Sequence, residues 1–274
     1  MAAFVERSRC PGCGSGAVTT LLSRDFAHPS VWRFVERRYQ GRLSRRELAG
    51  RHHEVARCSL CQLLFHRYVL SDASLARLYG EWTSEPEPRA NEGAPGVLLQ
   101  PPTPARVLDL GAGEGDFCAA AREAGCEVIA VEIAPTLLER LQDQGFEAYS
   151  RIEDVERSDI GLARCHQIVE HLPRPLETLR ALAERLAPGG RIELSVPDAS
   201  RTSADLSCTF WSAGDDALRP LEHLNGFTPR SLGWLARQLG LSCSAPRATG
   251  LARMRRPSTM HRTLERPGTG GIAP

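Results

Sequence analysis

The sequence predicts an α/β fold with a mostly parallel sheet, and three observations carry this prediction. An apolar run, Val107–Leu110, enters a turn with glycine at every second position. A second apolar run, Val128–Val131, ends in an acid, Glu132, about 20 residues after the first run, as in a βαβ unit. Further along, a Pro-Gly-Gly turn precedes a third apolar run, Arg191–Val196. Helices are expected on both faces of such a sheet.

The elements of this domain follow one another in a regular order. We expect strands at 106–110, 127–131 and 191–196, helices at 116–124 and 135–144, and a possible strand at 241–245. Two segments fit this order poorly. Residues 160–164 read Ile-Gly-Leu-Ala-Arg, which predicts a weak central strand, and 250–274 is rich in Arg, Pro and Gly, which predicts a disordered tail without a last strand.

The glycine-rich turn indicates a nucleotide-cofactor loop. Glycines at 111, 113 and 115 let the backbone turn tightly and approach a ligand, and the following helix offers its free N–H groups. In the stretch VLDLGAGEG, Asp109 precedes the first glycine by two positions. This stretch resembles the first motif of the class I S-adenosylmethionine (SAM) dependent methyltransferases, whose fold is Rossmann-like. A nicotinamide fingerprint would place its third glycine at position 116, where this chain has aspartate, so a dehydrogenase is disfavoured.

Composition narrows the class of partner. The chain of 274 residues has 42% hydrophobic residues and a formal net charge of +1, which argues against a general electrostatic grip on nucleic acid or anionic lipid. The first residues lack an apolar core of a signal peptide, and no apolar run reaches the length of a membrane span. We therefore expect a cytoplasmic protein with no membrane partner. The sequence does not predict an oligomeric state.

Paired cysteines predict a structural zinc site near the N-terminus. Two Cys-x-x-Cys knuckles together offer the four thiolates that zinc prefers in a closed, structural site; they are Cys10, Cys13, Cys58 and Cys61. The alternative is two unrelated pairs of buried or redox cysteines. His52 and His53 could replace a thiolate, but with four cysteines available we expect both on the surface.

The residues between the knuckles predict one or two amphipathic helices within 30–57. An arginine cluster in this segment could meet an anionic substrate or a nucleic acid, although such clusters are more often solvated; it comprises Arg37, Arg38, Arg42, Arg45 and Arg46. A zinc ribbon ahead of a methyltransferase domain resembles a bacterial group that includes deoxysugar C-methyltransferases. The expected organisation is a ribbon module at 1–80, a linker at 81–104, the methyltransferase domain at 105–249 and the tail at 250–274.

The resemblance implies a role for each candidate cofactor residue. The three glycines would pass the methionine part of SAM, Glu132 would hold the ribose hydroxyls and Ile133 would pack on adenine. Glu153 or Asp154 would approach the adenine amino group, and Gln167 begins a further motif, Gln167–Pro173. Asp109 is expected mainly to brace the loop, or only to cap its strand.

Two histidines are candidates for the base that removes the acceptor's proton. His171 lies in a Glu-His-Leu-Pro stretch that is as often a packing motif as a catalytic one. In Glu222-His223, the carboxylate is expected to raise the proton affinity of the imidazole, and the resemblance makes His223 the base. The alternative is a structural histidine ahead of the Pro229 helix. The sugar enzymes place a tyrosine two residues before this Glu, where the chain has Pro220, which puts sugar C-methylation in doubt.

The sequence therefore predicts a zinc-ribbon methyltransferase acting on a small molecule, such as a sugar or an intermediate of secondary metabolism. One alternative makes RNA the substrate, with the ribbon and its arginines as the reader. Another is a degenerate SAM-binding scaffold, suggested by the weak central strand and the atypical tail. Phe210 and Trp211 are expected to line the acceptor pocket or to belong to the core.

Overall fold

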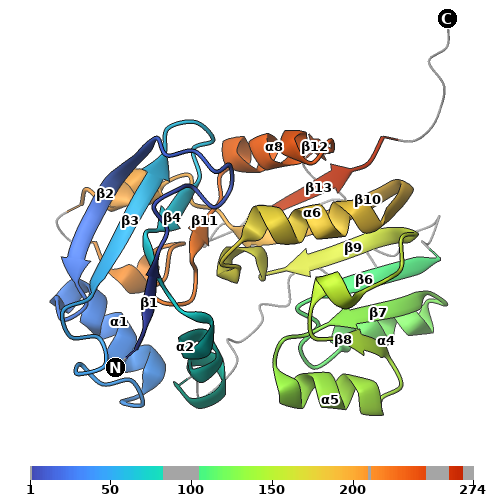
Figure 1. Cartoon of the computed structure of the whole chain (residues 1–274), viewed down its shortest axis with the longest axis horizontal. Coiled ribbons are helices and arrows are strands. Elements are labelled where there is room, and N and C mark those ends of the chain that lie inside the picture. Colours follow the sequence, from blue (N-terminus) through green and yellow to red (C-terminus); the bar gives the residue numbers. More distant parts are fainter. Residues whose placement is uncertain (1, 83–104, 209–210, 245–258, 268–274) are drawn as a thin grey trace, which may run out of the picture. The chain divides into compact units, whose positions relative to one another are not determined.

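The computed structural model describes residues 2–82, 105–208, 211–244 and 259–267. Residues 83–104 of the predicted linker, residues 250–258 and 268–274 of the predicted tail, and Phe210 lie outside them. The predicted start of the linker at 81 was wrong, because Glu81 and Trp82 belong to a π-helical turn in which Trp82 is buried. The chain divides into two compact units (Figure 1). The first comprises Met1–Pro88, Glu170–Leu176 and Pro197–Leu235, and the second comprises Arg89–Val169, Glu177–Val196 and Ala236–Pro274. The first unit thus takes in two later segments besides the expected ribbon module.

The second unit is built on a seven-stranded sheet. Its strand order is β12-β13-β10-β9-β6-β7-β8, with β10-β9, β9-β6, β6-β7 and β7-β8 parallel and β12-β13 antiparallel. The strands are β6 (Arg106–Leu110), β7 (Glu127–Val131), β8 (Glu147–Tyr149), β9 (Ile160–His166), β10 (Leu186–Pro197), β12 (Ser242–Ser244) and β13 (Thr259–Glu265). The chain reverses its direction across the sheet at β6, which is where open α/β sheets bind ligands. The predicted α/β fold is confirmed.

Helices α4 (Asp116–Glu123), α5 (Pro135–Asp143) and α6 (Pro175–Arg185) connect these strands. Helix α4 buries Phe117 and Ala121 in a cluster with Val107 of β6 and Leu162 of β9. Leu141 of α5 packs in a second cluster with Ala130 of β7. The predicted strands at 106–110 and 127–131 have these same bounds in the structure, and both helices end one residue earlier than predicted.

Two expectations for this sheet were wrong. Residues 160–166 form a full strand, β9, in which Ile160, Leu162 and Cys165 are buried between two parallel neighbours. The tail also contains a strand. β13 is inserted between β12 and β10, where Thr263 Oγ1 donates to Glu193 Oε2 at 2.9 Å and Arg266 N donates to Gly190 O at 3.0 Å. Its sequence, TMHRTLE, has only three buried residues, so no apolar run marked it.

The first unit contains a four-stranded antiparallel sheet in the order β11-β4-β3-β2. Its strands are β2 (Val18–Asp25), β3 (His52–Cys58), β4 (Leu64–His66) and β11 (Asn225–Gly226). A two-stranded sheet pairs β1 (Phe4–Glu6) with β5 (Tyr68–Leu70). The unit also contains helices α1 (Pro29–Tyr39), α2 (Asp72–Arg77) and α7 (Thr202–Asp205) and a π-helical turn, η1 (Leu78–Trp82). Helix α8 (Pro229–Gln238) begins in this unit and ends in the second. Where one or two helices were predicted, within 30–57, the chain thus forms one helix, α1, and a strand, β3.

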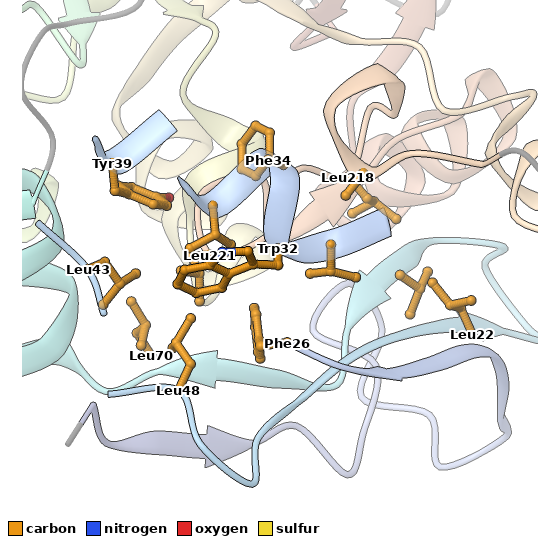
Figure 2. Close-up of a cluster of buried hydrophobic side chains, with 14 of the residues drawn as sticks. Leu22, Phe26, Trp32, Phe34, Tyr39, Leu43, Leu48, Leu70, Leu218 and Leu221 are labelled. Carbon is orange, nitrogen blue, oxygen red and sulfur yellow. The ribbon is translucent and has the colours of Figure 1, made fainter. Parts of the chain in front are cut away.

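The buried side chains of helix α1 lie within the hydrophobic core of this unit (Figure 2). Trp32, Phe34 and Tyr39 are buried with side chains from β2, from the 43–48 turn and from the distant 218–221 segment. Trp211 belongs to the same core: its Nε1 donates to Asp216 Oδ2 at 2.9 Å and its ring stacks on His53. Trp211 is therefore a core residue. Among the described helices, none is long and apolar enough to cross a membrane.

Candidate functional site

The four knuckle cysteines come together in the first unit. The Sγ atoms of Cys10 and Cys61 lie 3.5 Å apart, as do those of Cys13 and Cys58, and all four lie within 4.8 Å of one another. A tetrahedral zinc with Zn–S bonds of about 2.3 Å separates its sulfurs by roughly 3.8 Å. The cluster therefore has the donor set and the spacing of a closed zinc site. Gly12 permits the turn, because a Cβ there would lie 2.9 Å from Leu63 Cδ2.

Histidines are not part of this cluster. His52 is exposed, as expected, but His53 is only 2% exposed, so its predicted surface position was wrong. Its ring lies edge-on to His66, with ring centroids 4.7 Å apart, and burial lowers the pKa of His53 to about 3. Burial, with His53 and Arg7 nearby, also holds the pKa of His66 well below its usual range. Both imidazoles are neutral core residues.

The glycine-rich loop at the end of β6 has the backbone that its sequence predicts. Gly111, Gly113 and Gly115 all adopt positive φ, at 77°, 58° and 88°, where a side chain is strained. Space excludes a side chain too: a Cβ at Gly115 would lie 2.8 Å from Leu141 Cδ2, and one at Gly111 would lie 3.0 Å from Ile168 Cγ1. Gly111 N and Ala112 N both donate to Val131 O. The loop is thus fixed to the carboxyl end of β7 in an open, backbone-lined form.

Glu132 completes this attachment. It is 8% exposed, its Oε2 accepts from Gly113 N at 2.8 Å and its Oε1 accepts from Ala134 N at 2.9 Å. A carboxylate has about four acceptor sites, so each oxygen can accept a further hydrogen bond. Held at the carboxyl end of β7 beside the glycine loop, the side chain fits the ribose hydroxyls of a nucleoside cofactor.

Asp109 lies in β6 and is 1% exposed. Its Oδ1 accepts from Arg164 Nη1 on the neighbouring strand β9 at 3.0 Å, and Arg164 covers the ring of Phe117 at 4.7 Å from its centroid. In the sequence, Arg164 was one of the residues that made 160–164 look like a weak strand. The structure shows it as the counter-ion of Asp109.

The other candidate cofactor residues also lie at the carboxyl ends of the strands or just beyond them. Ile133 is 75% exposed directly after β7. Glu153 and Asp154 lie in a short 3-10 helix, η2 (Ile152–Asp154), after β8. Gln167 follows β9 with φ 50°, and its Nε2 donates to Ser195 Oγ of β10 at 3.2 Å. In the second unit, the predicted cofactor residues therefore lie together at the carboxyl ends of the strands.

A second set of polar side chains gathers in the first unit. The rings of His171 and His223 lie edge-on at 79°, with centroids 4.8 Å apart. Nδ1 of His223 donates to Ala217 O at 2.8 Å, so the hydrogen is on Nδ1 and the lone pair on Nε2. Nδ1 of His171 and the hydroxyl of Tyr79 are 3.1 Å apart. Glu170, 1% exposed, has a carboxylate oxygen within 4.8 Å of a nitrogen of each histidine.

The expected effect of Glu222 on His223 was wrong. The Glu222 carboxylate, 1% exposed, accepts from Arg38 Nε at 2.8 Å and from the Tyr39 hydroxyl at 2.9 Å. Burial, with His171 and Arg219 nearby, holds the pKa of His223 well below its usual range. The side chains of Glu222 and His223 thus have different partners although they are neighbours in sequence. Leu221, directly before them, has a positive φ of 70°. Arg38 is therefore an internal ion-pair partner rather than part of a solvated basic face.

Sequence reasoning missed several members of these sites. Glu170 was quoted only within a motif, and nothing singled out Tyr79, Tyr39 or Arg38 as partners of the candidate site. Their contacts join residues more than 90 positions apart, which no local spacing records. A glutamate directly before His171, in a motif already named, was the one available signal.

Comparison with known proteins identifies the family. A profile described as a methyltransferase domain matches residues 92–245, more than half of the chain. The chain therefore belongs to the methyltransferase-domain family, and it has the fold and the cofactor loop of the class I SAM-dependent methyltransferases.

Individual relatives cover less of the chain. A ubiquinone biosynthesis O-methyltransferase of Xanthomonas axonopodis pv. citri is 34% identical over 104 residues, which cover 34% of this chain and 44% of that protein. The Xanthomonas campestris pv. campestris (strain B100) protein of the same name is 34% identical over 101 residues, which cover 33% and 42%. The chain thus matches less than half the length of these relatives.

Solved structures are similar at lower identity. A 1,6-didemethyltoxoflavin-N1-methyltransferase of Burkholderia thailandensis, bound to S-adenosylhomocysteine, is 19% identical with a TM-score of 0.44, covering 63% of this chain and 76% of that one. A SAM-dependent methyltransferase of Mesorhizobium loti is 17% identical with a TM-score of 0.46, covering 64% and 99%.

Proposed function

We propose that the protein transfers a methyl group from SAM to a small-molecule acceptor, such as a sugar or an intermediate of secondary metabolism. The observation that carries this proposal is the glycine loop tied to Glu132 within a segment that matches the methyltransferase-domain family. The names of the matched relatives, ubiquinone biosynthesis O-methyltransferases, favour a small acceptor over a macromolecule.

The cofactor roles proposed for the second unit follow its geometry. The backbone of Gly111–Gly115 passes the methionine part of SAM, and the Glu132 carboxylate accepts hydrogen bonds from the ribose hydroxyls. Ile133, exposed after β7, offers an apolar face to adenine. Glu153 or Asp154 accepts a hydrogen bond from the adenine amino group, and Gln167 lies directly after β9. Asp109 supports this edge through its ion pair with Arg164.

The four cysteines are proposed to hold zinc. With four thiolates the ion has no open coordination position, so its role is to stabilise the turns that flank β2 and β3 rather than to contact the acceptor. SAM supplies the activated methyl group, and zinc supplies only folding free energy.

Proton removal from the acceptor is assigned to the paired imidazoles of the first unit. Methyl transfer breaks the bond between the methyl carbon and the sulfonium, forms a bond to the acceptor atom, and requires that atom to lose a proton where it carries one. Nε2 of His223 is the candidate base, since Nδ1 of the same ring already donates to Ala217 O. Glu222 then acts by position: it is held by Arg38 and Tyr39 of α1 and fixes the backbone directly before His223.

Product formation tests this function. The zinc-loaded protein is incubated with SAM and, separately, with panels of phenols, deoxysugar nucleotides and short RNAs, and S-adenosylhomocysteine is measured. Acceptor-dependent release with a member of the small-molecule panels supports the proposal. Release only with RNA would overturn the small-molecule class. SAM binding with no release in any panel would favour a scaffold.

A further inference from the structure

We propose that Glu170, His171 and His223 form a second metal site, which binds a divalent cation and is separate from the cysteine cluster. One carboxylate oxygen and one nitrogen of each imidazole lie within 4.8 Å of one another. Two imidazoles and a carboxylate form a donor set that binds divalent first-row metals and leaves coordination positions open. A closed four-thiolate site, in contrast, has no such positions.

Partners beyond the donors orient both imidazoles. Histidines that bind metals almost always donate their other ring N–H to an oxygen, which fixes the tautomer and aims the ligating nitrogen. Nδ1 of His223 donates to Ala217 O at 2.8 Å, and Nδ1 of His171 lies 3.1 Å from the Tyr79 hydroxyl. In His223, Nε2 is therefore the nitrogen available to the ion, and in His171 the same holds for the tautomer in which Nδ1 donates to the Tyr79 hydroxyl. The near-perpendicular rings allow two such nitrogens to meet at one point without stacking.

The two chain segments that supply these donors are fixed to each other by hydrogen bonds. Asn225 Nδ2 donates to Leu172 O at 2.7 Å and to Glu170 O at 3.4 Å. Asn225 Oδ1 accepts from Arg7 Nη1 at 3.0 Å, and Arg7 Nη2 also donates to Leu224 O at 2.6 Å. Residues 170–172 and 223–225 are thus held side by side by hydrogen bonds of the protein itself. A preorganised site loses less entropy when it takes up an ion.

This inference rests on the proposed function and refines it. A divalent ion with open positions can bind the acceptor through oxygen and lower the pKa of that hydroxyl, so that its proton leaves to water before methyl transfer. The acceptor oxygen then forms the new C–O bond while the C–S bond breaks and its electron pair stays on sulfur. When the ion is bound, Nε2 of His223 is a ligand, and the ion replaces it in activating the acceptor hydroxyl; the role of base proposed above belongs to the pair without an ion. The acceptor class that follows is a hydroxylated small molecule able to chelate through oxygen.

Titration with Mn²⁺ tests the site directly. Mn²⁺ is the weakest binder among the divalent first-row metals and does not displace zinc. The protein is therefore loaded with a single equivalent of zinc, which the four thiolates take up, and is then titrated, with free Mn²⁺ measured by electron paramagnetic resonance. Wild-type protein should bind a single Mn²⁺ per chain. Glu170→Gln and His171→Ala should each weaken binding at least tenfold, and Tyr79→Phe, which removes an outer partner, roughly tenfold.

Matched controls separate the site from general effects. His52→Ala removes an exposed histidine of the same unit and should leave Mn²⁺ binding unchanged. Circular dichroism and zinc content show that each variant is folded. Absence of Mn²⁺ binding to the wild type would overturn the proposal, and so would binding that survives both Glu170→Gln and His171→Ala. SAM binding is measured on the same samples, so failure of the cation site is distinguishable from failure of the proposed methyl transfer.

Discussion

At the residue scale, buried carboxylates fix the backbone of both candidate sites. Glu132 accepts from the N–H groups of Gly113 and Ala134, and so joins the cofactor loop to the end of β7. Glu222 accepts from Arg38 and Tyr39 of α1, and so fixes the segment that contains His223. In each case a charge that is costly to bury is satisfied by several donors. The carboxylates therefore connect segments that are far apart in sequence.

The Arg38–Glu222 ion pair should contribute strongly to stability. Arg38→Ala would leave the 1% exposed Glu222 carboxylate with one fewer charged donor, and loss of one partner of a buried pair destabilises by about 3 kcal/mol or more. Urea unfolding measures this change in the free energy of unfolding. Arg33→Ala, on the exposed face of the same helix, should change it by less than about 0.5 kcal/mol. Equal effects of the two substitutions would contradict this account.

Single residues were predictable from sequence only where a local motif fixed them. The glycine loop and Glu132 were found because their spacing follows from a βαβ unit. The effect of Glu222 on His223 was wrong because neighbours in sequence point to different partners once the chain folds. Arg164 was misread for a related reason: its counter-ion, Asp109, lies on another strand.

At the element scale, the cysteine module is completed by a segment from much later in the chain. β11 pairs with β4, and residues 218–221 pack in the core around α1. Sequence could predict the knuckles and, in the second unit, the strands β6 and β7 and most of β10, whose apolar patterns are local. It could not predict β11, which has two residues, or β13, whose pairing is supplied by β10 and β12 rather than by its own hydrophobicity.

Removal of the proposed zinc should unfold this module. Cys13→Ser would leave three thiolates, and structural zinc contributes folding free energy directly. We expect lower zinc content by mass spectrometry and a thermal unfolding transition at least about 5 °C lower, in keeping with a loss above 1 kcal/mol. Cys208→Ser changes an exposed, single cysteine and serves as the control. Full zinc content in Cys13→Ser would rule out the four-cysteine site.

At the scale of the whole molecule, the described residues do not show the weak central strand or the missing last strand that suggested a degenerate scaffold. β9 is a full strand with buried side chains, and β13 occupies the place of the last strand. The sheet keeps its reversal at β6, with the glycine loop directly after β6 and Glu132 directly after the neighbouring β7. The described part of the chain thus retains the cofactor-binding architecture of its family.

Stability of the whole chain should fall in mild acid. His53 has a folded pKa of about 3 because it is buried, whereas an unfolded histidine titrates near 6.5. Between these values the unfolded state binds the extra proton, so stability is full above about pH 6.5 and falls as the pH is lowered toward 3, by up to about 1.4 kcal/mol per pH unit for this residue. His66 acts in the same direction.

Urea unfolding at several pH values measures this dependence. Carboxylates also lose their favourable charge in acid, so His53→Phe, which removes one titrating ring beside Trp211, isolates the histidine contribution. This variant should show a shallower loss of stability between pH 6.5 and 4, estimated from the same linkage. The exposed His52→Phe variant should keep the wild-type slope, and an unchanged slope in His53→Phe would refute the assignment.

Calorimetric titration of the zinc-loaded protein with SAM tests the central claim most directly. We expect saturable binding with one SAM per chain, weakened at least about tenfold, or about 1.4 kcal/mol, by Glu132→Ala. Glu139→Ala, an exposed acid on α5, should bind SAM as the wild type does. Absence of SAM binding to the folded protein, or equal binding by Glu132→Ala, would contradict the cofactor site described above.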